Sequence, residues 1–125
     1  MNSEEFVKSI IDVVRDASIS DSIEDLVDPP GRKPSSEDLE LSNWFLHLND
    51  KEKEIVVNII RRAVDTSIFG FFTVLDGVRP IVDSDKGILE LYYRENDNNH
   101  FLNTNQEEYL HDIFNRKIEN DNTRL

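Results

Sequence analysis

The amino-acid sequence predicts an α+β fold: a helical N-terminal half with a long buried central helix, followed by a small antiparallel β-meander and a C-terminal helix. Two observations lead to this prediction. Apolar residues recur at helical spacing as far as about Leu75, and beyond Pro80 they alternate with polar residues as in strands. The length of 125 residues suits one hydrophobic core, so we expect residues 1–118 to form a single domain and residues 119–125 a polar tail.

The N-terminal segment predicts two helices. The first covers about Ser3–Ala17, because Asn2 and Glu5 have the spacing of a capping box and apolar residues follow at helical spacing. A short second helix is expected to begin at Asp21, which also has an acid three residues later. The Pro-Pro-Gly sequence at 29–31 must end it.

A surface loop over Asp28–Ser35 is expected to lead into a third helix. Ser36 is its predicted N-cap, and the helix carries apolar side chains as far as Leu48. It is expected to stop near Asn49-Asp50, where either residue can begin the next helix.

The longest predicted element runs from about Asp50 to Leu75 and closes at Asp76-Gly77. Apolar side chains surround nearly the whole circumference of its second half, which is typical of a buried helix. We expect an interruption at Gly70. The stretch Thr66–Leu75 also fits a strand, because it contains β-branched and aromatic residues.

The segment beyond Pro80 predicts a three-stranded antiparallel meander. Its strands are expected at Ile81-Val82, Gly87–Arg94 and His100–Asn103, joined by polar turns at Asp83–Gly87 and Glu95–Asn99.

The last predicted element is a helix that begins with Thr104 or Asn105 as its cap. It carries apolar residues as far as Phe114, and the polar tail from about Glu119 is expected to fray.

The composition narrows the possible functions. The formal net charge is −12, and there is no cysteine. Phosphate contacts need clustered Lys and Arg, so we expect no nucleic-acid partner. No apolar run approaches the roughly 18 residues of a membrane span, and acids stand where a signal peptide needs bases. These features predict a cytoplasmic protein without a membrane partner.

The sequence holds no motif that predicts catalysis. His47, His100 and His111 do not form a spaced pair, and without cysteine the sequence predicts no metal site. The stretch Asp83–Gly87 is similar to a calcium loop, but its glycine comes one position early, so a hairpin turn explains it better. There is no nucleophile elbow or phosphate-binding loop. We therefore expect neither an enzyme nor a cofactor.

The negative charge is concentrated in the N-terminal part, where residues 1–50 hold 12 acids and 4 bases. Acids three and four apart share helix faces, and Trp and Tyr are enriched in binding hot spots. The alternative is that the acids serve only for solubility. The residues predicted to bind a basic protein partner are Asp21, Glu24, Asp25, Asp28, Glu37, Asp38, Glu40, Trp44 and Tyr92.

The second half of the chain resembles a group of small bacterial proteins of unassigned role, some of which look like immunity proteins of toxin and contact-dependent inhibition systems. The resemblance covers Val64–Val78, Gly87–Tyr93, Leu102-Asn103 and Leu110–Asn115. Its most particular sequences are Leu-Asp-Gly at 75–77 and the six residues from Leu110. The resemblance implies an immunity function, and it assigns no catalytic residue to this chain.

Three functions are compatible with these observations. The first is an immunity or inhibitor protein whose acidic face covers the cationic active site of a toxin such as a nuclease. The second is a small-ligand or enzymatic domain, with His100 or His111 near a carboxylate in a pocket between the central helix and the hairpin. The third is an oligomeric structural module that uses an exposed strand edge.

Overall fold

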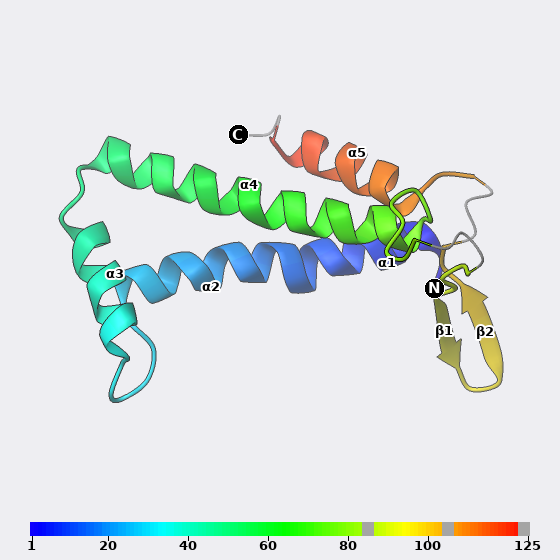
Figure 1. Cartoon of the computed structure of the whole chain (residues 1–125), viewed down its shortest axis with the longest axis horizontal. Helices are drawn as coiled ribbons and strands as arrows, with labels where there is room; N and C mark the ends of the chain where they lie inside the picture. The colour runs from blue at the N-terminus through cyan, green and yellow to red at the C-terminus, as the bar shows by residue number, and fades with distance from the viewer. Residues whose placement is uncertain (84–86, 104–106, 123–125) are drawn as a thin grey trace. The chain divides into compact units, whose positions relative to one another are not determined.

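The computed structural model describes residues 1–83, 87–103 and 107–122, and it confirms the predicted α+β class with a C-terminal helix (Figure 1). By contact, the chain divides into two compact units. The first consists of Met1–Val13 and Thr66–Leu125, and the second is Val14–Asp65. In order, the elements are α1 (Ser3–Ile10), η1 (Ile11–Arg15, a π-helical segment), α2 (Asp16–Val27), α3 (Ser36–Leu46), α4 (Asp50–Leu75), β1 (Tyr92–Glu95), β2 (Asn98–Phe101) and α5 (Leu110–Asn122).

The N-terminal helix begins as predicted, with a capping box. The Glu5 backbone N–H donates to Asn2 Oδ1 at 2.8 Å, and the Glu5 carboxylate accepts from the Asn2 backbone N–H. The predicted boundary at Asp21 is wrong, because helical backbone continues to Val27. A cap needs a non-helical residue, and no glycine or proline interrupts the chain before Pro29.

The start of α3 is shifted by one residue from the prediction. Ser35 is the cap, and its Oγ accepts from the Asp38 backbone N–H at 3.1 Å. Helix α4 is capped by Asn49, whose Oδ1 accepts from the Glu52 backbone N–H at 2.8 Å. The Glu52 side chain accepts from the Asn49 backbone N–H at 3.0 Å, so this is a second capping box.

Helix α4 ends at the predicted residue, in a Schellman motif. The Gly77 N–H donates to the Val74 carbonyl at 3.1 Å and the Val78 N–H to the Thr73 carbonyl at 3.0 Å. Gly77 has a φ of +77°, which glycine adopts without steric cost. The expected interruption at Gly70 is wrong, as is the alternative of a strand, because α4 is continuous.

The prediction that α4 is buried on all sides is only partly correct. Phe72 and Thr73 are buried, whereas Ile59 and Phe71 are 61% and 62% exposed. Apolar side chains therefore surround this helix, but they do not all pack against other parts of the described chain.

The predicted three-stranded meander is a two-stranded hairpin. Strands β1 and β2 pair antiparallel, with Tyr92 opposite Phe101 and Glu95 opposite Asn98. The turn between them places Asn96 at a φ of 56°, as expected for a residue that tolerates left-handed backbone. Ile81-Val82 is not a strand.

The side chain of Asn103 explains why the second predicted strand, Gly87–Arg94, begins only at Tyr92. Its Oδ1 accepts from the Leu91 N–H at 2.8 Å, and its Nδ2 donates to the Leu89 carbonyl at 2.9 Å and the Leu75 carbonyl at 2.6 Å. A side-chain amide therefore satisfies backbone groups that the prediction assigned to strand pairing. The expected caps Thr104 and Asn105, and residues 84–86 of the expected turn, lie outside the described residues.

The core of the first unit lies where α1 packs against α5 beside the second half of α4 (Figure 1). Phe72 contacts Phe6 and Phe114 edge to face, with ring centroids 6.1 and 5.7 Å apart. Helix α5 continues to Asn122 and so includes the first residues of the segment expected as a polar tail. The buried apolar residues of this core are Val7, Ile11, Phe72, Leu110, Ile113 and Phe114.

The second unit contains a buried ion pair and a small aromatic contact. Arg15 donates from Nε to Asp65 Oδ1 at 2.8 Å and from Nη2 to Asp65 Oδ2 at 3.1 Å, and its side chain is only 8% exposed. Helix α2 packs against α3. On α3, Phe45 is buried, and Lys53 Nζ lies 5.8 Å from the centre of its ring.

Candidate functional site

Three of the predicted partner-binding acids, Asp21, Glu24 and Asp25, share one face of α2, on the side opposite the half-buried side chains Ile19, Ile23 and Leu26. A fourth, Asp28, is the non-helical C-cap residue that follows α2. All four are exposed.

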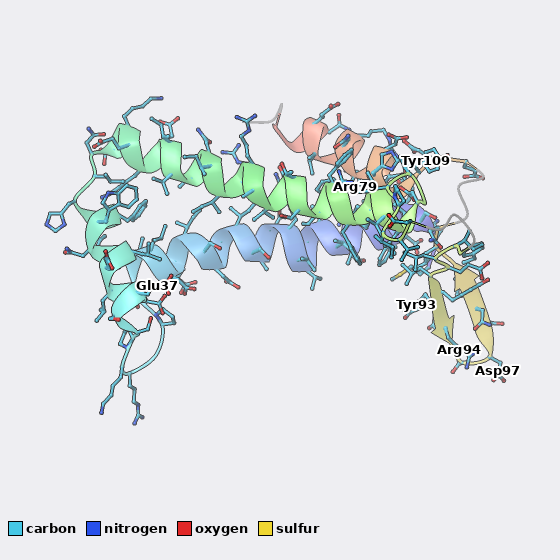
Figure 2. The ribbon with its side chains drawn as sticks, in the orientation of Figure 1. Glu37, Arg79, Tyr93, Arg94, Asp97 and Tyr109 are labelled. Atoms are coloured by element: carbon cyan, nitrogen blue, oxygen red, sulfur yellow. The ribbon has the colours of Figure 1, made fainter. Side chains whose placement is uncertain are left out.

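Helix α3 places two acids and the tryptophan on one face. Glu37, Glu40 and Trp44 follow at intervals of three and four residues, and all three are exposed (Glu37 is labelled in Figure 2). Asp38 is half-buried and lies on the same side as the buried Ser42 and Phe45. It therefore does not belong to this face, although the sequence grouped it with the other acids.

The six exposed acids described above form no ion pair within the described residues. Arg32 and Lys33, the bases of the intervening loop, form none there either. Some acids elsewhere are paired, for example Glu54 with Lys51 at 3.7 Å. We refer to Asp21, Glu24, Asp25, Asp28, Glu37 and Glu40 as the α2–α3 acids.

Trp44 lines a shallow pocket on the exposed face of α3. The pocket has a volume of about 360 Å³ and is formed by Glu40, Asn43, Trp44, His47 and Leu48. His47 Nδ1 lies 2.6 Å from the Asn43 carbonyl oxygen, which holds the imidazole against the helix. Trp44 is 56% exposed. The pocket thus combines an open indole ring with a carboxylate from the adjacent turn.

Tyr92, the remaining predicted binding residue, belongs to the first unit. It is 50% exposed and stacks on Phe101 across the hairpin, with ring centroids 4.9 Å apart. Its hydroxyl donates to Glu90 at 3.0 Å, and this hydrogen bond raises the pKa of Tyr92. Figure 2 shows Tyr93 and Arg94 on the same hairpin and Asp97 at its turn. Tyr92 is therefore an exposed aromatic of the first unit, whereas the α2–α3 acids belong to the second.

Hydrogen bonds connect the Leu-Asp-Gly sequence at 75–77 with the six-residue sequence that begins at Leu110. Asp76 of Leu-Asp-Gly accepts hydrogen bonds from the backbone N–H groups of Leu110 at 3.1 Å and His111 at 3.0 Å, the first residues of α5. His111 Nδ1 also lies 2.6 Å from Asp76 Oδ2. The Asp76 side chain is fully buried. An acid that ends one helix therefore caps another, and sequence reasoning did not foresee it.

The imidazole of His111 is enclosed by aromatic rings. It stacks on Tyr109 with ring centroids 5.2 Å apart, and Phe69 contacts it edge to face. His111 does lie next to a carboxylate, as the enzymatic alternative required. The Asp76 carboxylate, however, caps α5, so a structural role explains why it lies next to His111.

His100 lines an open cavity of about 620 Å³ in the first unit, together with Glu4, Glu107 and Glu108. Arg116 donates hydrogen bonds to both Glu4 and Glu108. Two of the three carboxylates are thus already paired. None of its described lining residues belongs to α4, so it is not the pocket between the central helix and the hairpin that the small-ligand alternative expects.

The remaining functional signals are few. Among residues 1–83, 87–103 and 107–122, no three His, Asp or Glu side chains come together as metal ligands. Over the same ranges, none of the helices has the length and apolar character needed to cross a bilayer. No protein-family model, curated protein or solved structure matches this chain.

Proposed function

We propose that this chain is a binding protein that uses the α2–α3 acids and Trp44 to dock onto a basic protein. The observation that carries the proposal is that six exposed acids lie close together in the sequence of the second unit and form no ion pair within the described residues. Like charges on one helix face destabilise the helix by a few tenths of a kcal/mol per pair, so a cationic partner would relieve a cost. Such a field also speeds encounter with a positive surface.

The particular form that we propose is a cytoplasmic immunity or inhibitor protein. Its acidic surface would cover the cationic active site of a toxin, such as a nuclease, and thereby exclude the substrate. It would act by binding and would not catalyse a reaction. The resemblance of the second half of the chain to immunity proteins and the absence of catalytic motifs from the sequence support this form.

The test compares two variants with the same net charge. One carries Asp21→Asn, Glu24→Gln and Asp25→Asn on α2. The matched control carries Glu54→Gln, Glu95→Gln and Asp97→Asn, which are exposed acids elsewhere. Basic proteins captured from the source organism by the wild-type chain at low salt are identified, purified and titrated against all three chains by calorimetry.

We expect the α2 variant to bind about tenfold more weakly than the wild type, because each exposed ion pair contributes about 0.5 kcal/mol. The control should bind as the wild type does, and binding should weaken as salt rises. If both variants bind equally well, or if no basic protein binds, the proposal is wrong. For the immunity form, coexpression of the captured protein should inhibit growth unless this chain is also present.

A further inference from the structure

The Trp44 pocket has the composition of a site for an arginine side chain. We infer that it holds one arginine of the basic partner, with the guanidinium on the indole face and paired with Glu40. This inference rests on the proposed function and adds the identity of the residue that anchors the partner.

The first support is the state of the Trp44 ring. Within the described residues, no cation of the chain itself lies over this indole, whereas Lys53 lies 5.8 Å from the ring centre of the neighbouring Phe45. Trp44 also makes no ring contact with another aromatic residue in the described ranges. Tryptophan is the ring that attracts a cation most strongly. Its face is therefore left available on an exposed surface.

The second support is charge complementarity. Glu40 lines the same pocket and Glu37 lies one turn away on the same face. Neither forms an ion pair with any residue that the structure describes. Leu48 adds apolar surface to the pocket lining. An arginine fits this combination, because its methylene stem covers apolar surface while its planar head both stacks and pairs with a carboxylate. A lysine ammonium is compact and strongly hydrated, so it gains less from a flat ring.

The experiment uses two blocked peptides of equal charge, tetra-arginine and tetra-lysine, at low ionic strength. Trp44 is the only tryptophan of the chain, so its fluorescence reports on this pocket alone. We expect tetra-arginine to change the emission of Trp44 and to bind about two to five times more tightly than tetra-lysine. Calorimetry provides the affinities independently of fluorescence.

Three variants identify the groups responsible. Trp44→Leu should abolish the preference for arginine while leaving residual salt-dependent binding, and Glu40→Gln should weaken binding of tetra-arginine. Glu54→Gln removes the same charge from α4 and should leave both affinities unchanged. Circular dichroism checks that each variant is folded, which we expect because Trp44 and Glu40 are exposed.

The outcomes separate this inference from the proposed function. If both peptides bind equally and Trp44→Leu has no effect, the arginine site is wrong while the acidic docking surface stands. If neither peptide binds, both are wrong. If the emission of Trp44 changes with protein concentration and sedimentation shows a dimer, a second copy of the chain covers the pocket, and the inference is overturned.

Discussion

The Asp76→Ala substitution should destabilise the protein strongly, because the Asp76 carboxylate caps the N-terminus of α5. Its oxygens accept from the Leu110 N–H at 3.1 Å, the His111 N–H at 3.0 Å and His111 Nδ1 at 2.6 Å, and the side chain is fully buried. Loss of an N-cap costs about 0.5–2 kcal/mol, and a buried unsatisfied polar group costs about 1–3 kcal/mol. Because Leu110 is buried, water cannot replace the carboxylate fully. We expect a loss of about 3–5 kcal/mol.

This loss is a large fraction of the roughly 5–15 kcal/mol by which a typical protein is stable. The assay is urea denaturation followed by circular dichroism, with the free energy of unfolding extrapolated to water. Asp76→Asn keeps an acceptor oxygen and should lose about half as much. Asp97→Ala removes an exposed acid from the hairpin turn and should change stability by less than about 0.5 kcal/mol. A loss below about 1 kcal/mol for Asp76→Ala would refute the proposed capping role.

Two further predictions concern ion pairs. Arg15→Ala should lower the free energy of unfolding by about 3–5 kcal/mol in urea denaturation, because it leaves the largely buried Asp65 carboxylate without its two hydrogen bonds. A double variant, Arg15→Met with Asp65→Leu, should recover much of this loss. If it recovers none, the loss does not come from the unpaired carboxylate. The hydrogen bond from Arg116 lowers the pKa of Glu4 below its ordinary value of 4.5, so its stabilising contribution is complete above that value and is lost as the pH falls through the lowered pKa. The difference in melting temperature between the wild type and Glu4→Gln should therefore shrink between about pH 7 and about pH 3, and a difference that stays constant with pH would contradict the reasoning.

Local signals in the sequence predicted the ends of several helices correctly. Three of these signals depend only on contacts between residues a few positions apart, so a short stretch of sequence includes both partners of each contact. They are the capping box at Asn2, the cap at Asn49 and the C-terminal glycine Gly77. Asp21 had a similar signal, but the chain before it stays helical, and a residue inside a helix cannot act as a cap. Spacing alone does not distinguish the two situations.

The β region was predicted less well, because its pairing depends on a side chain far along the sequence. Alternation correctly indicated extended backbone near Tyr92 and Phe101. The Leu89 carbonyl and the Leu91 N–H, however, are bonded to the Asn103 side chain and not to a third strand. Periodicity reports which side chains share a face, but it does not report which group completes a hydrogen bond.

The features of the candidate site also fall into those that local sequence predicts and those that depend on distant contacts. The sequence by itself determined that Asp21, Glu24 and Asp25 share a face of α2 and that Glu37, Glu40 and Trp44 share a face of α3, because helix geometry fixes these relations. Only the tertiary structure decided that these acids form no ion pair within the described part of the chain, that Asp38 is half-buried and that Asp76 caps α5. Each of those facts depends on which distant residue the folded chain brings within hydrogen-bonding range.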